Sequence, residues 1–298
     1  MSLRADATDF VKNARIVRDA IEYATLLPDY LRTRSLRADD ETFAAVHTYV
    51  MFIGIGRSGT TLIGSLLDAH PRIVIANQQT TLKYVSPPIF SRAQVFHLLL
   101  RNSREAARAG RPGGGGYTYA VEGQWQGRFE TLEVIGDKSK SAQAVTWLTS
   151  RPDLLADLAR VTRTRIRMIH VIRNPYDTIA TRSVRRHLSL PKITEEYFAL
   201  CDRLQRLIGM IEAASASDVQ RIPLHLEDFI AQPVAKLAFL CDQLGVGAGD
   251  GYLQDCARIL YRQPNKSRHK VAWNQRLVDE VAEKLTRVPF LRRYSFDE

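Results

Sequence analysis

The residues best suited to chemistry lie at positions 54–61, which read Gly-Ile-Gly-Arg-Ser-Gly-Thr-Thr. An apolar run at 49–53 precedes them and a helical pattern follows from Leu62, so the sequence predicts a strand, a glycine-rich turn and a helix. Such a turn aims backbone N–H groups and a helix N-terminus at one point, where an anion can bind. Four side chains of the turn can also bind anionic oxygens, namely Arg57, Ser58, Thr60 and Thr61.

The two outer glycines, Gly54 and Gly59, have the G-x-x-x-x-G spacing of the phosphate-binding P-loop in ATP- and GTP-using proteins. In that loop a lysine follows the last glycine, but here the position is Thr60. The positive side chain lies inside the loop instead, at Arg57. The pattern indicates a cradle for a phosphate-like group that serves a different chemistry.

A second candidate site follows the apolar run that ends at Ile172. Asn174 is a good N-cap and Pro175 a good first helical residue, so the sequence predicts a strand that ends at Arg173 and a helix behind it. Arg173 then projects from the carboxyl end of a strand, and Thr181 lies two turns into the helix. A third predicted strand, at residues 132–136, is followed by Lys138.

The elements that must position these groups alternate between strands and helices along the chain. We expect five strands, at residues 49–55, 72–76, 132–136, 166–172 and 221–226. We expect helices near 60–69, 89–108, 141–149, 152–160, 175–188, 194–215, 233–244, 249–261 and 274–287. This alternation predicts an α/β, P-loop-like, three-layer fold with a central parallel sheet of about five strands and helices on both faces. Ligands of such sheets bind beyond the carboxyl ends of the strands.

The length of 298 residues fits one domain over 1–298. We expect residues 1–45 to form a helical extension, interrupted at Pro28 and packed outside the core. Residues 46–298 form the α/β core with a basic C-terminal loop, 262–270, and a helix.

The overall composition limits the possible compartments and partners. Neither a membrane span nor a signal peptide is expected, because no apolar run is long enough and residues 1–10 are polar. Three cysteines without C-x-x-C spacing favour reduced thiols and a cytoplasmic location. The net charge of +10 indicates an acidic partner: a nucleotide with several phosphates, an acidic substrate, a nucleic acid or an anionic membrane surface.

The 57–61 string resembles the 5′-phosphosulfate loop of sulfotransferases that use 3′-phosphoadenosine 5′-phosphosulfate (PAPS). Residues 66–71, Leu-Leu-Asp-Ala-His-Pro, are similar to the branch that contains tyrosylprotein sulfotransferases and many bacterial enzymes. The resemblance implies that Arg57, Ser58, Gly59, Thr60 and Thr61 bind the donor nucleotide, and that Arg57 also acts in catalysis.

The same resemblance implies roles for the other strand ends. In the family an Arg at a strand end and a Ser eight residues later bind the 3′-phosphate, and Arg173 and Thr181 match that spacing. Lys138 matches a lysine that stabilises charge on the bridging oxygen as the sulfonyl group leaves. Related enzymes close a basic C-terminal loop over the nucleotide, which implies that Lys266 and Arg268 bind it.

The general base is missing from the pattern. Tyrosylprotein sulfotransferases place a Glu soon after the Leu-Asp-Ala-His-Pro string, whereas residues 75–80 here contain no carboxylate. A base accepts the acceptor's proton as the new bond forms. The sequence leaves four candidates open, His97, Glu122, Glu130 and His187.

The resemblance implies a metal-independent sulfotransferase that moves a sulfonyl group from PAPS to a hydroxyl or amine and releases 3′,5′-ADP. Its acceptor is open: a glycan, a peptide or a small molecule. The alternative is a P-loop kinase or NTPase with a degenerate Walker A motif, in which Asp137 helps to hold magnesium. A non-enzymatic polyanion or nucleic-acid binder is a third reading of the charge, but no recognition-helix pattern or aromatic stacking platform supports it.

Overall fold

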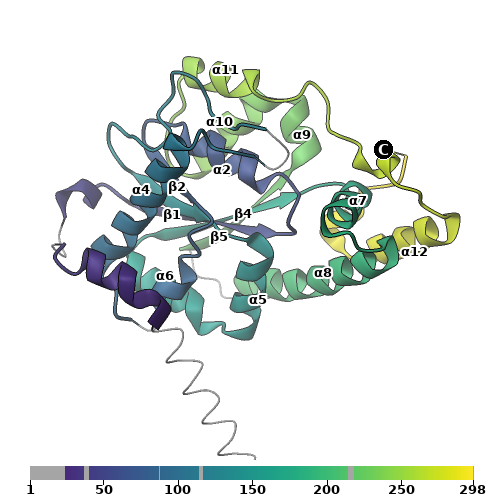
Figure 1. Ribbon diagram of the computed structural model, residues 1–298, viewed down its shortest axis with the longest axis horizontal. Helices are drawn as coiled ribbons and strands as arrows, with labels where there is room; N and C mark the ends of the chain where they lie inside the picture. Colours follow the sequence, from purple (N-terminus) through teal and green to yellow (C-terminus); the bar gives the residue numbers. More distant parts are fainter. Residues whose placement is uncertain (1–23, 37–39, 87, 114–116, 214–217, 298) are drawn as a thin grey trace, which may run out of the picture.

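The computed structural model describes residues 24–36, 40–86, 88–113, 117–213 and 218–297 (Figure 1). Their centre is a five-stranded sheet in the order β2-β3-β1-β4-β5, with every neighbouring pair parallel. The strands are β1 Thr48–Gly54, β2 Ile73–Asn77, β3 Val134–Lys138, β4 Arg165–Ile172 and β5 Val219–His225. All five strands that the sequence predicts are present, displaced by at most two residues at each end.

Helices cover both faces of the sheet, which confirms the predicted fold class (Figure 1). One face packs against α2, α10 and α11, and the other against α4, α5, α6 and α8. The α-helices are α2 Thr60–Asp68, α3 Leu82–Val85, α4 Arg92–Arg108, α5 Ser141–Ser150, α6 Asp153–Thr162, α7 Pro175–Arg186, α8 Leu190–Ala213, α9 Leu226–Ala231, α10 Pro233–Gln243, α11 Asp250–Arg258 and α12 Gln275–Thr286. Three short 3-10 helices are η1 Glu41–Phe43, η2 Ser267–Lys270 and η3 Pro289–Leu291.

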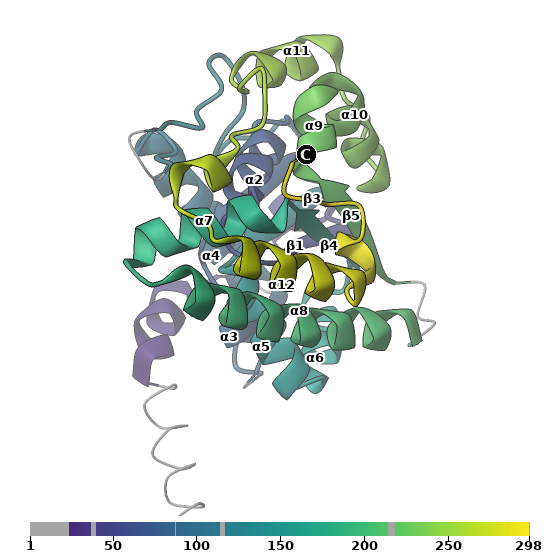
Figure 2. The ribbon, with the colours of Figure 1, turned by 90° about the vertical axis from the view of Figure 1, so that its right-hand side faces the viewer.

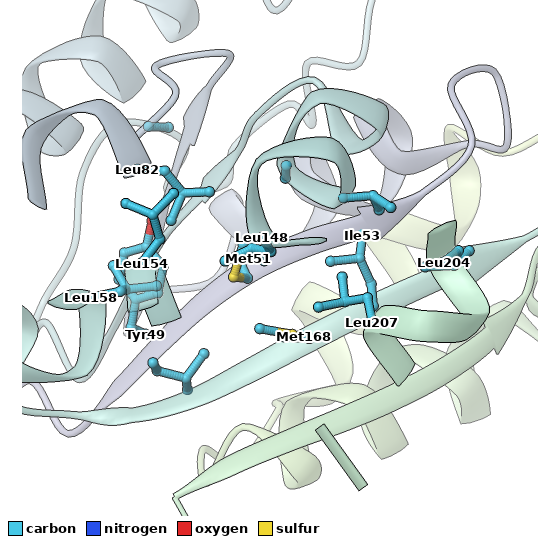
Figure 3. Packing of buried hydrophobic residues seen from close by; sticks show 14 of the residues in the cluster. Tyr49, Met51, Ile53, Leu82, Leu148, Leu154, Leu158, Met168, Leu204 and Leu207 are labelled. Carbon is cyan, nitrogen blue, oxygen red and sulfur yellow. The ribbon is translucent and has the colours of Figure 1, made fainter. Parts of the chain in front are cut away.

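Strand β1 shows why the central strands read as continuous apolar runs. Its alternate side chains enter two different cores, because successive residues of a strand face opposite sides of the sheet. Tyr49, Met51 and Ile53 join the core beneath α5, α6 and α8 (Figure 3). Val50 and Phe52 join the core beneath α2, α10 and α11. Both sides of β1 are therefore buried, as expected for a parallel sheet covered on both faces.

The strand order places the three predicted strand-end groups next to one another. Strand β1 lies between β3 and β4, so the carboxyl ends of these three strands are neighbours. Helices α2, α5 and α7 start just beyond those ends. The chain leaves β1 toward one side and reaches β4 on the other, and ligands of α/β sheets bind at such a switch point.

Figure 2 looks onto α7, α8 and α12 beside the sheet, with the C-terminal chain passing close to α7. Asn174 caps α7 as predicted, because its side chain accepts a hydrogen bond from the Tyr176 amide at 3.0 Å and Pro175 occupies the first turn.

The structure differs from the expected elements in three places. Helices α3 and α9 were not expected, and α9 begins directly where β5 ends. Residues 24–33 are helical through Pro28, so no interruption occurs there. Leu26 of this helix is fully buried in the larger core, so it is not packed outside the core. The expected helical extension before residue 24 lies outside the described residues.

Candidate functional site

The loop between β1 and α2 has a left-handed backbone conformation at two positions. Arg57 has φ of 82° and Gly59 has φ of 98°, both in the left-handed region. Gly59 is the N-cap of α2 and gives it no side-chain cap, so the first amides of the helix stay available. A side chain at Gly59 would also collide with Leu226, because an added Cβ would lie 2.7 Å from Leu226 Cδ1.

A cavity of about 270 Å³ opens over this loop. Its lining comes from five stretches that are far apart in the sequence, within 57–62, 117–119, 173–185, 226–230 and 259–267. The lining residues are Arg57, Gly59, Thr60, Thr61, Leu62, Tyr117, Tyr119, Arg173, Thr181, Arg185, Leu226, Ile230, Ile259, Leu260, Tyr261, Asn265 and Ser267. The structure therefore brings the loop and the Arg173–Thr181 pair to one cavity, as the strand order requires.

The Arg173 side chain is held in place by three oxygen atoms. Its Nη1 donates to the Arg57 carbonyl at 3.1 Å, and its Nη2 donates to the Asn265 carbonyl at 2.5 Å and to Ser267 Oγ at 3.2 Å. None of these acceptors is charged, so the positive charge has no ion-pair partner among the described residues.

Thr181 carries a buried hydroxyl with no hydrogen-bond partner among the residues described. The residue lines the cavity together with Arg173. A buried hydroxyl without a partner is costly unless a ligand satisfies it. Thr181 and Arg173 thus bring to one cavity a hydroxyl without a hydrogen-bond partner and a guanidinium group without an ion-pair partner, both counted among the described residues.

Arg185 lines the same cavity one turn beyond Thr181 on α7. Burial lowers the pKa of Arg57, and the positive charges of Arg185 and Arg173 lower it further. Neither Arg57 nor Arg185 forms an ion pair within the described part of the chain. Three unpaired guanidinium groups in one cavity leave a surplus of positive charge that suits a polyanion.

Lys138 lies at the end of β3 and is 6% exposed. Burial lowers its pKa to about 8, and the nearby charge of Arg57 acts in the same direction. Its aliphatic chain packs against α2 at Gly64, where an added Cβ would lie 3.1 Å from Lys138 Cβ. The described lining of the cavity does not include Lys138, although its ammonium group is close enough to Arg57 for their charges to interact.

Asp137 points away from the site. Its carboxylate accepts hydrogen bonds from the Thr81 amide and hydroxyl, at 2.9 and 3.2 Å, and from the Gln79 amide at 3.2 Å. It orders the turn after β2, and burial raises its pKa to about 6. An Asp used in this way is not free to hold a magnesium ion, which counts against the kinase alternative.

An apolar wall completes the cavity, and sequence reasoning missed it. Its residues come from α9, from the end of α11 and from the loop beyond: Leu226, Ile230, Ile259, Leu260 and Tyr261. The Tyr117 ring lies 4.8 Å from the Tyr261 ring, which joins two distant loops across the opening.

Arg185 was also missed from the sequence. The signal that could have indicated it is its position four residues after Thr181, on the same helix face.

Three residues expected to bind the nucleotide are placed differently. Ser58 Oγ donates to the Ile55 carbonyl at 2.7 Å, so the hydroxyl is used inside the loop. Arg268 is 2% exposed and forms an ion pair with Asp177, so it cannot reach the cavity in this arrangement. Lys266 is exposed next to the lining residues Asn265 and Ser267, but it is not part of the described lining itself.

None of the four candidate bases is among the described residues that line the cavity. His97 Nε2 lies 2.6 Å from Asp40 Oδ2, and its ring packs on Phe43. Glu122, Glu130 and His187 are exposed.

A larger cavity, of about 610 Å³, lies at the other end of the sheet and is lined by residues of 40–44, 90–93 and 160–163. The guanidinium group of Arg92, which lines this cavity, already donates hydrogen bonds to the Val46 and Thr162 carbonyls, at 2.9 and 2.8 Å. Because the strand-end groups are far from it, we take the smaller cavity as the functional site. Within the described ranges, no group of three or more His, Cys, Asp or Glu side chains is arranged to hold a metal ion.

The fold is α/β with a P-loop-like turn after β1, and the cavity joins this turn to the Arg173–Thr181 pair beyond the neighbouring strand end. The sequence matches the model of the sulfotransferase family over residues 50–250, which is more than half of the chain. The chain belongs to the sulfotransferase family. No match was found among curated protein sequences.

The chain is also distantly similar to several solved structures, three of which are described as sulfotransferases. The sulfotransferase domain from the curacin biosynthetic pathway has 13% identity and a TM-score of 0.48, over 84% of this chain and 99% of that chain. Sulfotransferase STF9 from Mycobacterium avium has 12% identity and a TM-score of 0.49, over 92% and 83%. Mouse sulfotransferase SULT7A1 in complex with PAP has 13% identity and a TM-score of 0.36, over 80% and 74%. Because these likenesses are distant, we transfer no residue role from them.

Proposed function

We propose that the protein transfers a sulfonyl group from PAPS to a hydroxyl or amine of an acceptor and releases 3′,5′-ADP. The observation that carries the proposal is that two groups of cationic and hydroxyl-bearing residues line one cavity. One is the loop with Arg57, Thr60 and Thr61, and the other is Arg173 with Thr181. A nucleotide that carries acidic groups at both its 5′ and 3′ positions needs two such groups, whereas ATP needs only one.

The apolar wall supports an adenine subsite. Leu226, Ile230, Ile259 and Leu260 offer aliphatic surface, and Tyr261 offers an exposed ring on which a base can stack. We assign Arg185, beside Thr181, to the 3′-phosphate, because its guanidinium group is unpaired within the described residues.

In the proposed reaction, the acceptor oxygen or nitrogen forms a bond to sulfur while the bond between sulfur and the bridging oxygen breaks. The electron pair of that bond goes to the bridging oxygen of 3′,5′-ADP, and the proton of the acceptor goes to a base that we do not assign. Arg57 and Lys138 would stabilise the negative charge that develops there, and Lys138 must be protonated to do so. The step itself uses no metal ion.

The acceptor is a glycan, a peptide or a small molecule, and nucleic acid is not expected as a partner. We also propose a cytoplasmic location, as expected from the cysteine pattern. Among the described helices, none has the length and apolar character to cross a membrane.

The deciding experiment compares the thermal stability of the protein with 3′,5′-ADP, 5′-AMP, ATP, and ATP with magnesium. A ligand at 100 times its dissociation constant stabilises the folded state by about 2.7 kcal/mol, which raises the melting temperature by several degrees. We expect the largest increase with 3′,5′-ADP. An increase only with ATP and magnesium would contradict the proposal and favour the kinase alternative. A second assay then incubates the protein with PAPS and a mixture of glycan, peptide and small-molecule acceptors. Release of 3′,5′-ADP in this assay measures turnover.

A further inference from the structure

Among the described residues, Arg268 is the largest by volume whose side chain is almost completely buried, and all three nitrogens of its guanidinium group donate hydrogen bonds. Nε and Nη2 donate to the two carboxylate oxygens of Asp177, at 3.1 and 3.0 Å. Nη1 donates to the carbonyls of Ser295 and Phe296, at 3.1 and 2.7 Å. The backbone amide of Arg268 also donates to Asp177, at 2.9 Å.

These contacts fix a short segment that we call the strap, residues 265–268. The strap lies against the first turn of α7, where Asp177 is located, and α7 and η2 are neighbours in space (Figure 2). Its other end supplies the Asn265 carbonyl and the Ser267 hydroxyl that accept hydrogen bonds from Arg173. Arg268 thus anchors the segment that orients Arg173.

Residues 294–296 form hydrogen bonds with Arg268 and with the residues at the start of α7 and α9. Asn174 Nδ2 donates to the Ser295 carbonyl at 3.0 Å, so Ser295 connects the N-cap of α7 with Arg268. Glu227 accepts hydrogen bonds from the Asn174 amide and the Tyr294 hydroxyl, both at 2.8 Å. The start of α7, the strap and the chain end form one hydrogen-bonded unit.

We propose that Arg268 and Asp177 are positioning residues that hold the strap so that Arg173 is aimed at the 3′-phosphate. This inference rests on the proposed function and replaces the direct phosphate contact that the resemblance implies for Arg268. A direct contact would require Arg268 to leave Asp177, and a buried carboxylate without its partner is strongly unfavourable.

The two roles predict opposite results for Asp177→Asn. If Arg268 bound the phosphate directly, weakening its partner would free it, and affinity for 3′,5′-ADP would stay equal or increase. If Arg268 and Asp177 instead position the strap, Asp177→Asn weakens 3′,5′-ADP binding by about 10-fold, because the charge-assisted contact of Arg173 loses its alignment. Binding of 5′-AMP does not change, since it lacks the 3′-phosphate.

A single substitution of Asp177 or Arg268 leaves the other charge buried without its partner and could unfold the protein. A double variant avoids this. Asp177→Leu/Arg268→Met replaces the pair with apolar side chains, which buried ion pairs often tolerate. We expect this variant to fold and to lose about 10-fold in 3′,5′-ADP affinity, no more than either single variant, because the two residues act through one contact. Arg293→Ala is the matched control, since Arg293 belongs to the same chain end but pairs with Asp228.

The measurements are the dissociation constants of 3′,5′-ADP and 5′-AMP by calorimetry, with hydrogen exchange at residues 265–268 as a second readout. We expect faster exchange in the strap and a smaller preference for 3′,5′-ADP in the double variant, with Arg293→Ala unchanged. A folded double variant with the parent's preference would overturn the positioning role. A parent protein without that preference would instead overturn the proposed function, and this inference with it.

Discussion

Arg173 Nη1 donates a hydrogen bond to the backbone carbonyl of Arg57 at 3.1 Å, which ties the end of β4 to the loop after β1. The residue expected to recognise the 3′-phosphate is thus in direct contact with the loop expected to hold the 5′-phosphosulfate. A change at Arg173 should therefore affect both ends of the nucleotide, but unequally.

For Arg173→Ala we expect affinity for 3′,5′-ADP to fall by about 10- to 150-fold, the equivalent of a charge-assisted hydrogen bond. Affinity for 5′-AMP should fall much less, because only the bond to the Arg57 carbonyl is lost on that side. Titration calorimetry with both nucleotides measures the two effects. Arg287→Ala, which removes an exposed arginine at the end of α12, is the control. Equal affinity of the variant and the parent for 3′,5′-ADP would rule out the assignment.

Thr181→Val should separate stability from binding. The change removes a buried hydroxyl without a partner among the described residues, so the folded protein should become more stable by about 1 kcal/mol. Affinity for 3′,5′-ADP should decrease by about 10-fold, and Thr181→Ser should retain it. Thermal melting and calorimetry together test this prediction.

The matched control is Thr178→Val, one turn earlier on α7. Thr178 Oγ1 donates to the Asn174 carbonyl at 3.2 Å, so this variant should lose about 1 kcal/mol of stability and keep its nucleotide selectivity. If both valine variants destabilised the protein and neither changed affinity, Thr181 would have only a structural role.

Lys138 should give the reaction a dependence on pH. Because burial lowers its pKa from 10.5 to about 8, the folded protein releases this proton more readily than the unfolded chain. Activity as kcat/KM should therefore fall as pH rises through about 8, where the free enzyme loses the ammonium group. The stability of the parent should rise over pH 8 to 10.5, by up to about 3 kcal/mol, since unfolding takes up the proton in that window.

Lys138→Met should lower kcat by about 10²- to 10³-fold while nucleotide affinity changes little, and should remove that rise in stability. Lys140→Met, at an exposed lysine two residues later, is the control for both measurements. A variant that loses affinity but keeps kcat would make Lys138 a binding residue.

Gly136 should tolerate no side chain. An added Cβ would lie 2.3 Å from the Val50 carbonyl oxygen, and neither strand backbone can move without breaking its pairing. We expect Gly136→Ala to cost about 3 kcal/mol of unfolding free energy, measured by denaturant titration. Gly209→Ala should instead add up to about 1 kcal/mol, since Gly209 is an exposed position within α8 with open space around it. Equal stability of the two variants would contradict this account.

The sheet could be predicted from the sequence because buried parallel strands appear as apolar runs between helical patterns. Helix α9 was missed because Leu226 continues the alternation of apolar residues in β5, after Ile222 and Leu224. The loop and the Arg173–Thr181 spacing could be recognised because each is encoded within a few residues. The strand order that unites them depends on long-range pairing, which periodicity does not report.

The role of Arg268 could not be predicted for the same reason. The sequence shows an arginine in a basic loop, but its partners Asp177 and Ser295 are 91 and 27 residues away. Burial of an arginine depends on such distant carboxylates and carbonyls. The apolar wall was hidden in a similar way, since Ile259 and Leu260 read as the end of a helix.

The left-handed backbone of Arg57 has a consequence for engineering. A non-glycine residue at φ of 82° costs about 1–2 kcal/mol relative to glycine. A search for heat-resistant variants would therefore select Arg57→Gly, and the gain in melting temperature would come with the loss of the guanidinium group at the proposed donor site. Arg57 thus makes the loop less stable than glycine would, but it places a positive charge there. We expect Arg57→Gly to raise the stability of the protein and to abolish its activity.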